Sequence, residues 1–158
     1  MAGTELLFRL AELNTDYAAA IDADRLEDWP GFFHAACLYK ITTAENHRKN
    51  YPAGIIYADS RGMLEDRVAA LRRANIYERH AYRHILGLPR ILGAEGAEVR
   101  AETAFLVVRT MRTGEMSLFA AGRYLDVLRP DETGALRFAE RLAICDSPRF
   151  DTLLAIPL

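Results

Sequence analysis

The chain has 158 residues, of which 51% are hydrophobic and 27% are charged, and this balance is typical of one globular domain. Its formal net charge of −2 argues against a nucleic-acid partner, since phosphate binding requires a basic surface. No apolar run is long enough to span a membrane, and the first residues lack the basic and apolar regions of a signal peptide. We therefore expect one cytoplasmic domain, residues 1–158, with no nucleic-acid or membrane partner.

The first part of the chain predicts two helices and a strand. Apolar residues recur every three or four positions over 4–22, which predicts a long amphipathic helix that covers a sheet. A short second helix is expected at 25–29, because Pro30 and Gly31 would end it. The apolar segment 37–42 predicts a strand. The inner face of the first helix would hold Leu6, Leu10, Leu13, Tyr17 and Ile21.

The next part predicts a loop, a short strand and a third helix. Residues 44–52 are polar and are expected to form a loop, and 55–58 form a short apolar strand. Asp59 and Ser60 are candidate N-caps for a helix over 62–73. The charged residues of this helix are expected to form a solvated face.

A stretch at 76–87 decides how the chain is interpreted, because Glu78, His80 and His84 form the pattern E-x-H-x-x-x-H. On a helix the two histidines would lie on one face and could share a metal ion. On a strand they would stand about 13 Å apart, which is too far for one zinc ion.

We interpret this stretch as a strand, because its tyrosines and isoleucine suit a pleated surface and a turn signal follows at Gly87. Alternation along the strand places Arg79 and Arg83 on one face and puts the histidines and Tyr82 on the other. One face would serve the core or a pocket, and the other would meet a partner.

The remaining sequence predicts three long strands and an apolar tail. The strands are expected at 98–111, 117–128 and 136–144, with tight turns between them that imply an antiparallel meander. The tail, 150–158, is apolar, so we expect it to dock on the sheet or on a neighbouring subunit. Helices followed by a curved antiparallel sheet indicate an α+β domain shaped as a cone.

The two cysteines, Cys37 and Cys145, lie in apolar, strand-like surroundings. Neither belongs to a C-x-x-C or C-x-H motif, so neither points to a zinc or iron–sulfur site. We expect both to be buried free thiols, as in cytosolic proteins.

Four motifs follow one another along the chain: Trp29-Pro30-x-Phe32-Phe33, Met63-Leu64-x-Asp66-Arg67, Tyr82-Arg83-His84-Ile85 and Cys145-Asp146-Ser147. Together with the order of the elements, they resemble the small (beta) subunit of Rieske-type aromatic-ring-hydroxylating dioxygenases. The resemblance covers essentially the whole chain. One departure is Gly87, which stands near a place where many members of that family have asparagine.

This resemblance implies a cone-shaped NTF2-like (SnoaL-like) fold, with N-terminal helices packed on a curved, mainly antiparallel sheet. It also implies a non-catalytic subunit without a cofactor, in an α3β3 hexamer. The large (alpha) subunit would carry the Rieske [2Fe–2S] cluster and a mononuclear Fe(II), and a reductase would supply electrons. Segments 75–89 and 151–158 are most similar to members that act on an aromatic carboxylate such as terephthalate or salicylate.

Two sets of residues are candidate sites. The candidate contacts with the large subunit or other small subunits are Tyr77, Arg79, His80, Tyr82, Arg83, His84, Leu153 and Leu154. The alternative is a free-standing isomerase or dehydratase of the same fold, or a small-ligand-binding protein, with acid–base or binding groups inside the cone. Its pocket would be formed by Tyr17, Tyr39, Tyr57 and His84.

Overall fold

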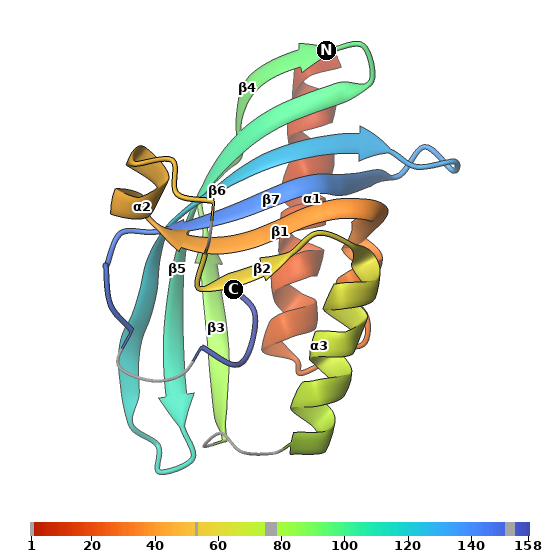
Figure 1. Cartoon of the computed structure of the whole chain (residues 1–158). Helices are drawn as coiled ribbons and strands as arrows, with labels where there is room; N and C mark the ends of the chain where they lie inside the picture. The colour runs from red at the N-terminus through yellow and green to blue at the C-terminus, as the bar shows by residue number, and fades with distance from the viewer. Residues whose placement is uncertain (1, 53, 75–78, 151–153) are drawn as a thin grey trace.

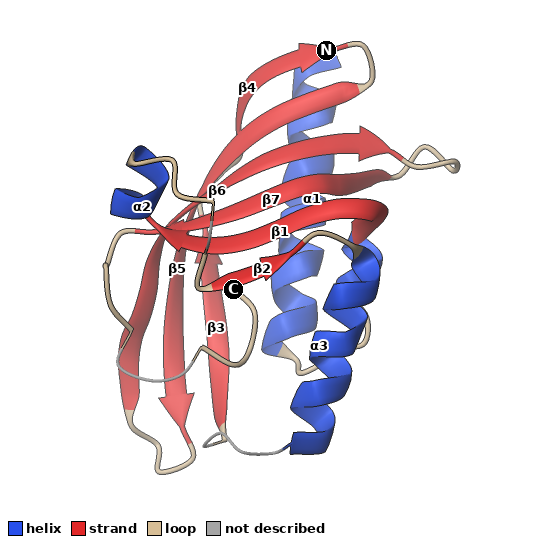
Figure 2. Ribbon diagram, viewed as in Figure 1, coloured by secondary structure: helices blue, strands red, loops and turns tan. Residues whose placement is uncertain are grey.

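The computed structural model describes residues 2–52, 54–74, 79–150 and 154–158. Two long helices pack on one side of a strongly curved sheet, which wraps around them as an open cone (Figure 1). Helices and strands form separate layers (Figure 2), so the expected α+β architecture is confirmed.

The long helices follow from the apolar spacing in the sequence. Helix α1 spans Ala2–Asp22 and buries Leu10, Tyr17 and Ile21, while α3 spans Arg61–Ala74 and buries Leu64 and Val68. None of the helices in the described residues combines the length and hydrophobicity needed to cross a membrane.

Helix α3 begins with a capping serine, and its charged side chains bond to other elements. The Ser60 hydroxyl accepts the Met63 N–H at 3.3 Å, so this residue caps the helix as expected. Several charged side chains of α3 are not simply solvated, because they bond to other elements. Arg61 donates to the main-chain oxygen of Phe33, and Arg72 binds the carboxylates of Asp24 and Glu27.

Two expectations for the short helices were wrong. The predicted helix at 25–29 is absent, and a 3₁₀ helix spans Trp29–Phe32 instead, with Pro30 in its first turn, where no N–H donor is needed. The loop predicted at 44–52 contains helix α2, Ala44–Arg48. The Thr43 hydroxyl accepts the Asn46 N–H at 3.1 Å, which starts this single turn despite its polar composition.

The sheet has seven strands in the order β2-β1-β7-β6-β5-β3, with β4 also paired to β5. All pairs are antiparallel except β1 with β7. Strands β5, β6 and β7 form the expected meander, and β4 was not predicted as a separate strand. The bounds are β1 Phe33–Thr43, β2 Ile56–Ala58, β3 His80–Leu86, β4 Arg90–Glu95, β5 Glu98–Met111, β6 Met116–Pro130 and β7 Leu136–Cys145.

The core lies inside the cone, between α1 and the inner face of the sheet, and a buried ion pair stands in it. Arg141 of β7 donates to both carboxylate oxygens of Asp126 of β6, at 2.9 and 2.8 Å, and neither side chain is more than 1% exposed. The guanidinium carbon lies 4.3, 4.0 and 3.9 Å from the ring centres of Tyr17, Tyr124 and Phe138. The interior is therefore filled by packed aromatic rings and a paired charge.

The tail docks inside the molecule, as expected from its apolar composition. Residues 154–158 are all buried, and Figure 1 shows the chain end between β2, β3 and α3. Arg67 of α3 donates to the main-chain oxygens of Leu154 and Ala155, at 3.0 and 3.1 Å. The tail thus closes the open side of the cone.

Candidate subunit-contact strand and the interior of the cone

Strand β3 has a buried face and an exposed face. Tyr82 and His84 are buried and His80 is half-buried, while the alternate residues Arg83 and Ile85 are exposed. The strand assignment and the alternation within it are confirmed. The histidines and Tyr82 face the helices, so the opposite face is the exposed one.

The inner face of β3 is held to the end of α1 by one carboxylate. Asp22 accepts the His84 Nδ1–H on one oxygen at 2.6 Å and the His84 main-chain N–H on the other at 2.8 Å. The ring of Tyr82 lies between the two histidine rings, 5.0 Å from that of His80 and 6.1 Å from that of His84. This arrangement orders the strand and fixes the ring of His84 against the end of α1.

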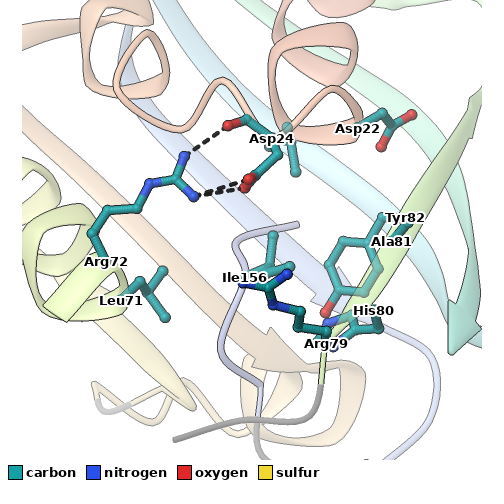
Figure 3. Close-up of a pocket in the computed structure, with 10 residues that line it drawn as sticks. Asp22, Asp24, Leu71, Arg72, Arg79, His80, Ala81, Tyr82 and Ile156 are labelled. Atoms are coloured by element: carbon teal, nitrogen blue, oxygen red, sulfur yellow. Dashed lines mark hydrogen bonds and ion pairs between the residues drawn. The ribbon is translucent and has the colours of Figure 1, made fainter. Parts of the chain in front are cut away.

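A polar hollow of about 440 Å³ lies at the mouth of the cone, between the end of α1, α3 and β3 (Figure 3). The expectation that Arg79 shares one face of the strand with Arg83 is wrong, because β3 begins at His80 and Arg79 lines this hollow. Arg72 crosses the hollow to the carboxylate of Asp24. The remaining residues that line it are Ile21, Asp22, Leu71, His80, Ala81, Tyr82 and Ile156.

The exposed face of β3 continues as an apolar surface across two further strands. The register sets Arg83 opposite Val108, and Val108 opposite Leu118, so these side chains share one face. Ile85 is 56% exposed and Leu118 is 74% exposed. We call this surface the outer patch; its members are Ala81, Arg83, Ile85, Leu106, Val108, Thr110, Met116 and Leu118.

Inside the cone, two tyrosines converge on the tail. Tyr17 of α1 and Tyr39 of β1 both donate from their hydroxyls to the main-chain oxygen of Leu158, at 2.7 and 3.0 Å. Burial raises the pKa of both phenols, so they are neutral hydrogen-bond donors. The tail, rather than an open cavity, fills this part of the interior.

The four residues of the alternative enzyme pocket do not form one site. Tyr57 is 48% exposed and lines a hollow with Lys40 and Tyr51, away from the interior. His84 is paired with Asp22 at the end of α1, and only Tyr17 and Tyr39 come together. Among the other predicted contacts, Leu154 is buried, whereas Tyr77 and Leu153 lie outside the described residues.

The side chains of the described residues do not suit an iron centre. No three of their histidine, cysteine, aspartate or glutamate side chains are placed to hold a metal ion. Both cysteines are buried free thiols, as expected, and burial raises the pKa of Cys145 to about 12. A metal needs the thiolate as a ligand, and this environment opposes its formation.

Comparison with known proteins places these features in a family. The sequence profile described as "Ring hydroxylating beta subunit" matches residues 16–151. Over 150 residues, the chain is 50% identical to subunit beta 1 of the terminal oxygenase component of terephthalate 1,2-dioxygenase from a Comamonas species, and the match covers 95% of this chain and 97% of that subunit.

Two further relatives agree. The chain is 38% identical over 151 residues to the small subunit of anthranilate 1,2-dioxygenase from Burkholderia cepacia, with 96% of this chain and 93% of that subunit covered. The crystal structure of the beta subunit of a proposed aromatic-ring-hydroxylating dioxygenase from Novosphingobium aromaticivorans superposes with a TM-score of 0.91 at 38% identity, over 100% of both chains.

Proposed function

This chain belongs to the ring-hydroxylating beta subunit family, and from that premise we propose that it holds a large oxygenase subunit in an α3β3 complex. It is the structural small subunit of an aromatic-ring-hydroxylating dioxygenase. The observation that carries the proposed role in assembly is the outer patch, because Ile85, Met116 and Leu118 are exposed on one face of three neighbouring strands, and exposed apolar groups gathered in this way mark interaction sites.

The proposed substrate is an aromatic carboxylate, oxygenated on the large subunit in the cytoplasm. Two relatives that match nearly the whole chain are subunits of enzymes named for terephthalate and anthranilate, which are both carboxylated benzene rings. The large subunit would carry the Rieske [2Fe–2S] cluster and the mononuclear Fe(II) and would receive electrons from a reductase. The side chains of the described residues here offer no metal-binding group, which supports this division of roles.

The outer patch is the surface that we propose for contact between subunits. Interface hot spots favour arginine beside well-packed apolar groups, and truncation there often costs about 2 kcal/mol, or about 30-fold in affinity. Arg83 is exposed and lies opposite Val108, which in turn lies opposite Leu118. It is therefore available to a carboxylate of the partner.

The test is co-purification of this chain with a tagged large subunit, followed by turnover of terephthalate normalised to intact complex. We expect Arg83→Ala and Leu118→Asp to reduce co-purification and to leave turnover per complex unchanged. Phe8→Asp is the matched control, because Phe8 is also exposed and apolar but lies on α1, away from the patch.

Two results would contradict the proposal. If Phe8→Asp weakens assembly as much as the variants of the patch, the patch has no special role. If complexes with Arg83→Ala assemble fully but no longer turn over, the chain contributes directly to catalysis. A mass other than that of three large and three small subunits would correct the stoichiometry.

A further inference from the structure

The polar hollow at the mouth of the cone is large enough to hold a small molecule. Its volume of about 440 Å³ lies within the range of about 300–1,000 Å³ that is usual for small-molecule sites. The end of α1, helix α3, the start of β3 and the tail all contribute to its walls (Figure 3). Because charged and apolar side chains both line the hollow, their arrangement indicates which class of ligand it suits.

The two carboxylates among the described residues that line the hollow already have partners. One oxygen of Asp22 accepts the His84 Nδ1–H, and the other accepts the His84 main-chain N–H. The two oxygens of Asp24 accept hydrogen bonds from Arg72 at 2.9 and 3.0 Å, and Arg72 also binds Glu27. These bonds join the end of α1 to β3 and to α3, so a cationic ligand would have to compete with them.

Arg79 supplies the hollow with a positive charge that these pairs do not use. Its main-chain oxygen accepts the Arg112 N–H at 3.2 Å, which ties this residue to the turn after β5. Figure 3 shows its side chain extending from the start of β3 toward Ile156. A guanidinium can bind both oxygens of a carboxylate at once, and such charge-assisted hydrogen bonds are stronger in a hollow than on an open surface.

The same hollow has an apolar wall. Ile21, Leu71 and Ile156 line it together with Tyr82. The ring of Tyr82 is stacked on that of Phe119, with the ring centres 5.3 Å apart, so its position is fixed. An apolar ring can therefore pack on this wall while a carboxylate attached to the ring reaches the guanidinium.

We propose that the hollow binds a small carboxylate attached to an aromatic ring, with the carboxylate on the Arg79 guanidinium and the ring against the apolar wall. The choice of an aromatic ring rests on the proposed function, because this is the chemical class of the proposed substrate. The site lies on the inner side of β3, whereas the outer patch is on its exposed face, and binding does not require assembly.

The test is calorimetry on the full chain with three probes. Benzoate has both the ring and the charge, benzyl alcohol has the ring without the charge, and acetate has the charge without the ring. We expect benzoate to bind at least about tenfold more tightly than either of the others, since it alone offers both groups.

Three variants locate the site. Arg79→Gln should weaken benzoate binding at least about tenfold and leave the binding of benzyl alcohol unchanged. Leu71→Glu introduces a carboxylate into the hollow and should also weaken benzoate binding, because like charges repel. Arg90→Gln is the matched control, because this arginine is 70% exposed and lies on β4, toward the start of α1 (Figure 1), and it should leave benzoate binding unchanged. None of the three residues is buried, so the variants should fold, and thermal melting checks this.

The proposal is wrong if benzoate binds no more tightly than benzyl alcohol or acetate, because ring and carboxylate would then not be recognised together. It is also wrong if Arg79→Gln keeps the affinity of the wild type, or if Arg90→Gln loses as much affinity as Arg79→Gln. Every measurement uses the isolated chain, so a failure of the chain to join a large subunit would count against the proposed function alone.

Discussion

The buried ion pair in the core gives a prediction whose magnitude follows from the structure. Arg141 makes two hydrogen bonds to Asp126 and a third to the side-chain oxygen of Asn14, and three aromatic rings surround its guanidinium. In the variant Asp126→Leu the guanidinium would stay buried without its counter-charge. Loss of one partner of a buried pair typically costs about 3–5 kcal/mol.

For a chain of this length, each kcal/mol lowers the melting temperature by about 2–4 °C, so we expect Asp126→Leu to melt about 6–20 °C below the wild type. The double variant Asp126→Leu/Arg141→Met removes both charges and fills a similar volume. Its stability should return to within about 2 kcal/mol of the wild type. Thermal unfolding gives the melting temperatures, and urea unfolding gives the free energies of unfolding. Both can be followed by the fluorescence of Trp29, the single tryptophan.

An exposed pair provides the control. Arg25 and Asp28 form an ion pair at 2.8 Å with both side chains more than half exposed, so Asp28→Ala should cost less than about 1 kcal/mol. The reasoning is refuted if Asp126→Leu costs as little as this control. It is also refuted if the double variant is as unstable as the two single changes added together.

Three further predictions concern reactivity, packing and pH. Because burial raises the pKa of Cys145 to about 12, Ellman's reagent at pH 8 should not modify it until the chain unfolds; rapid labelling of the native chain would contradict this. In Gly122→Ala the added Cβ would stand 2.0 Å from the main-chain oxygen of Ile144, so urea unfolding should show a loss of about 1–3 kcal/mol or more, and an unchanged midpoint would exclude the clash. The hydrogen bond from Arg72 lowers the pKa of Glu27 from 4.5 to about 2, so Glu27 stabilises the fold above pH 4.5 and this contribution is lost as the pH falls to about 2. Because Glu27 is 61% exposed, Glu27→Gln should cost less than about 1 kcal/mol at pH 7, and a difference from the wild type that persists at pH 2 would argue against the pair.

Periodicity predicted the elements whose apolar residues face one side. The inner face of α1 and the alternation of β3 and β5 were correct, because burial on one side imposes a regular spacing. Helix α2 was missed because its five residues, four of them polar, carry no such spacing, and a capping hydroxyl at Thr43 starts it instead.

The buried Arg141 was missed for a geometrical reason. Phe138 and Arg141 are three residues apart, so strict alternation would place them on opposite faces. The register between β6 and β7 shifts by one residue beside Phe138, and this bulge turns Arg141 inward with Asp126. The sequence alone does not show where such a bulge falls.

The docking of the tail was predicted, but not its position. Its hydrogen bonds join Leu158 to Tyr39, 119 positions earlier, and to Tyr17, 141 positions earlier. Only the assembled cone brings these residues together. Alternation predicted that β3 has two different faces, and only the packing of the helices shows which of them is exposed.

The bond between Asp22 and β3 has a consequence for solubility. The Gly87 N–H donates to the main-chain oxygen of Ala104 in β5, and in an antiparallel pair every second residue makes such hydrogen bonds. The odd-numbered residues of β3 therefore bond to β5, and the N–H of His84 points to the open side of the last strand in the sheet. An open side of this kind can recruit the strand of another molecule and begin a fibre. By accepting that N–H, the Asp22 carboxylate occupies the place where a foreign strand would start to pair, which protects this edge of the sheet.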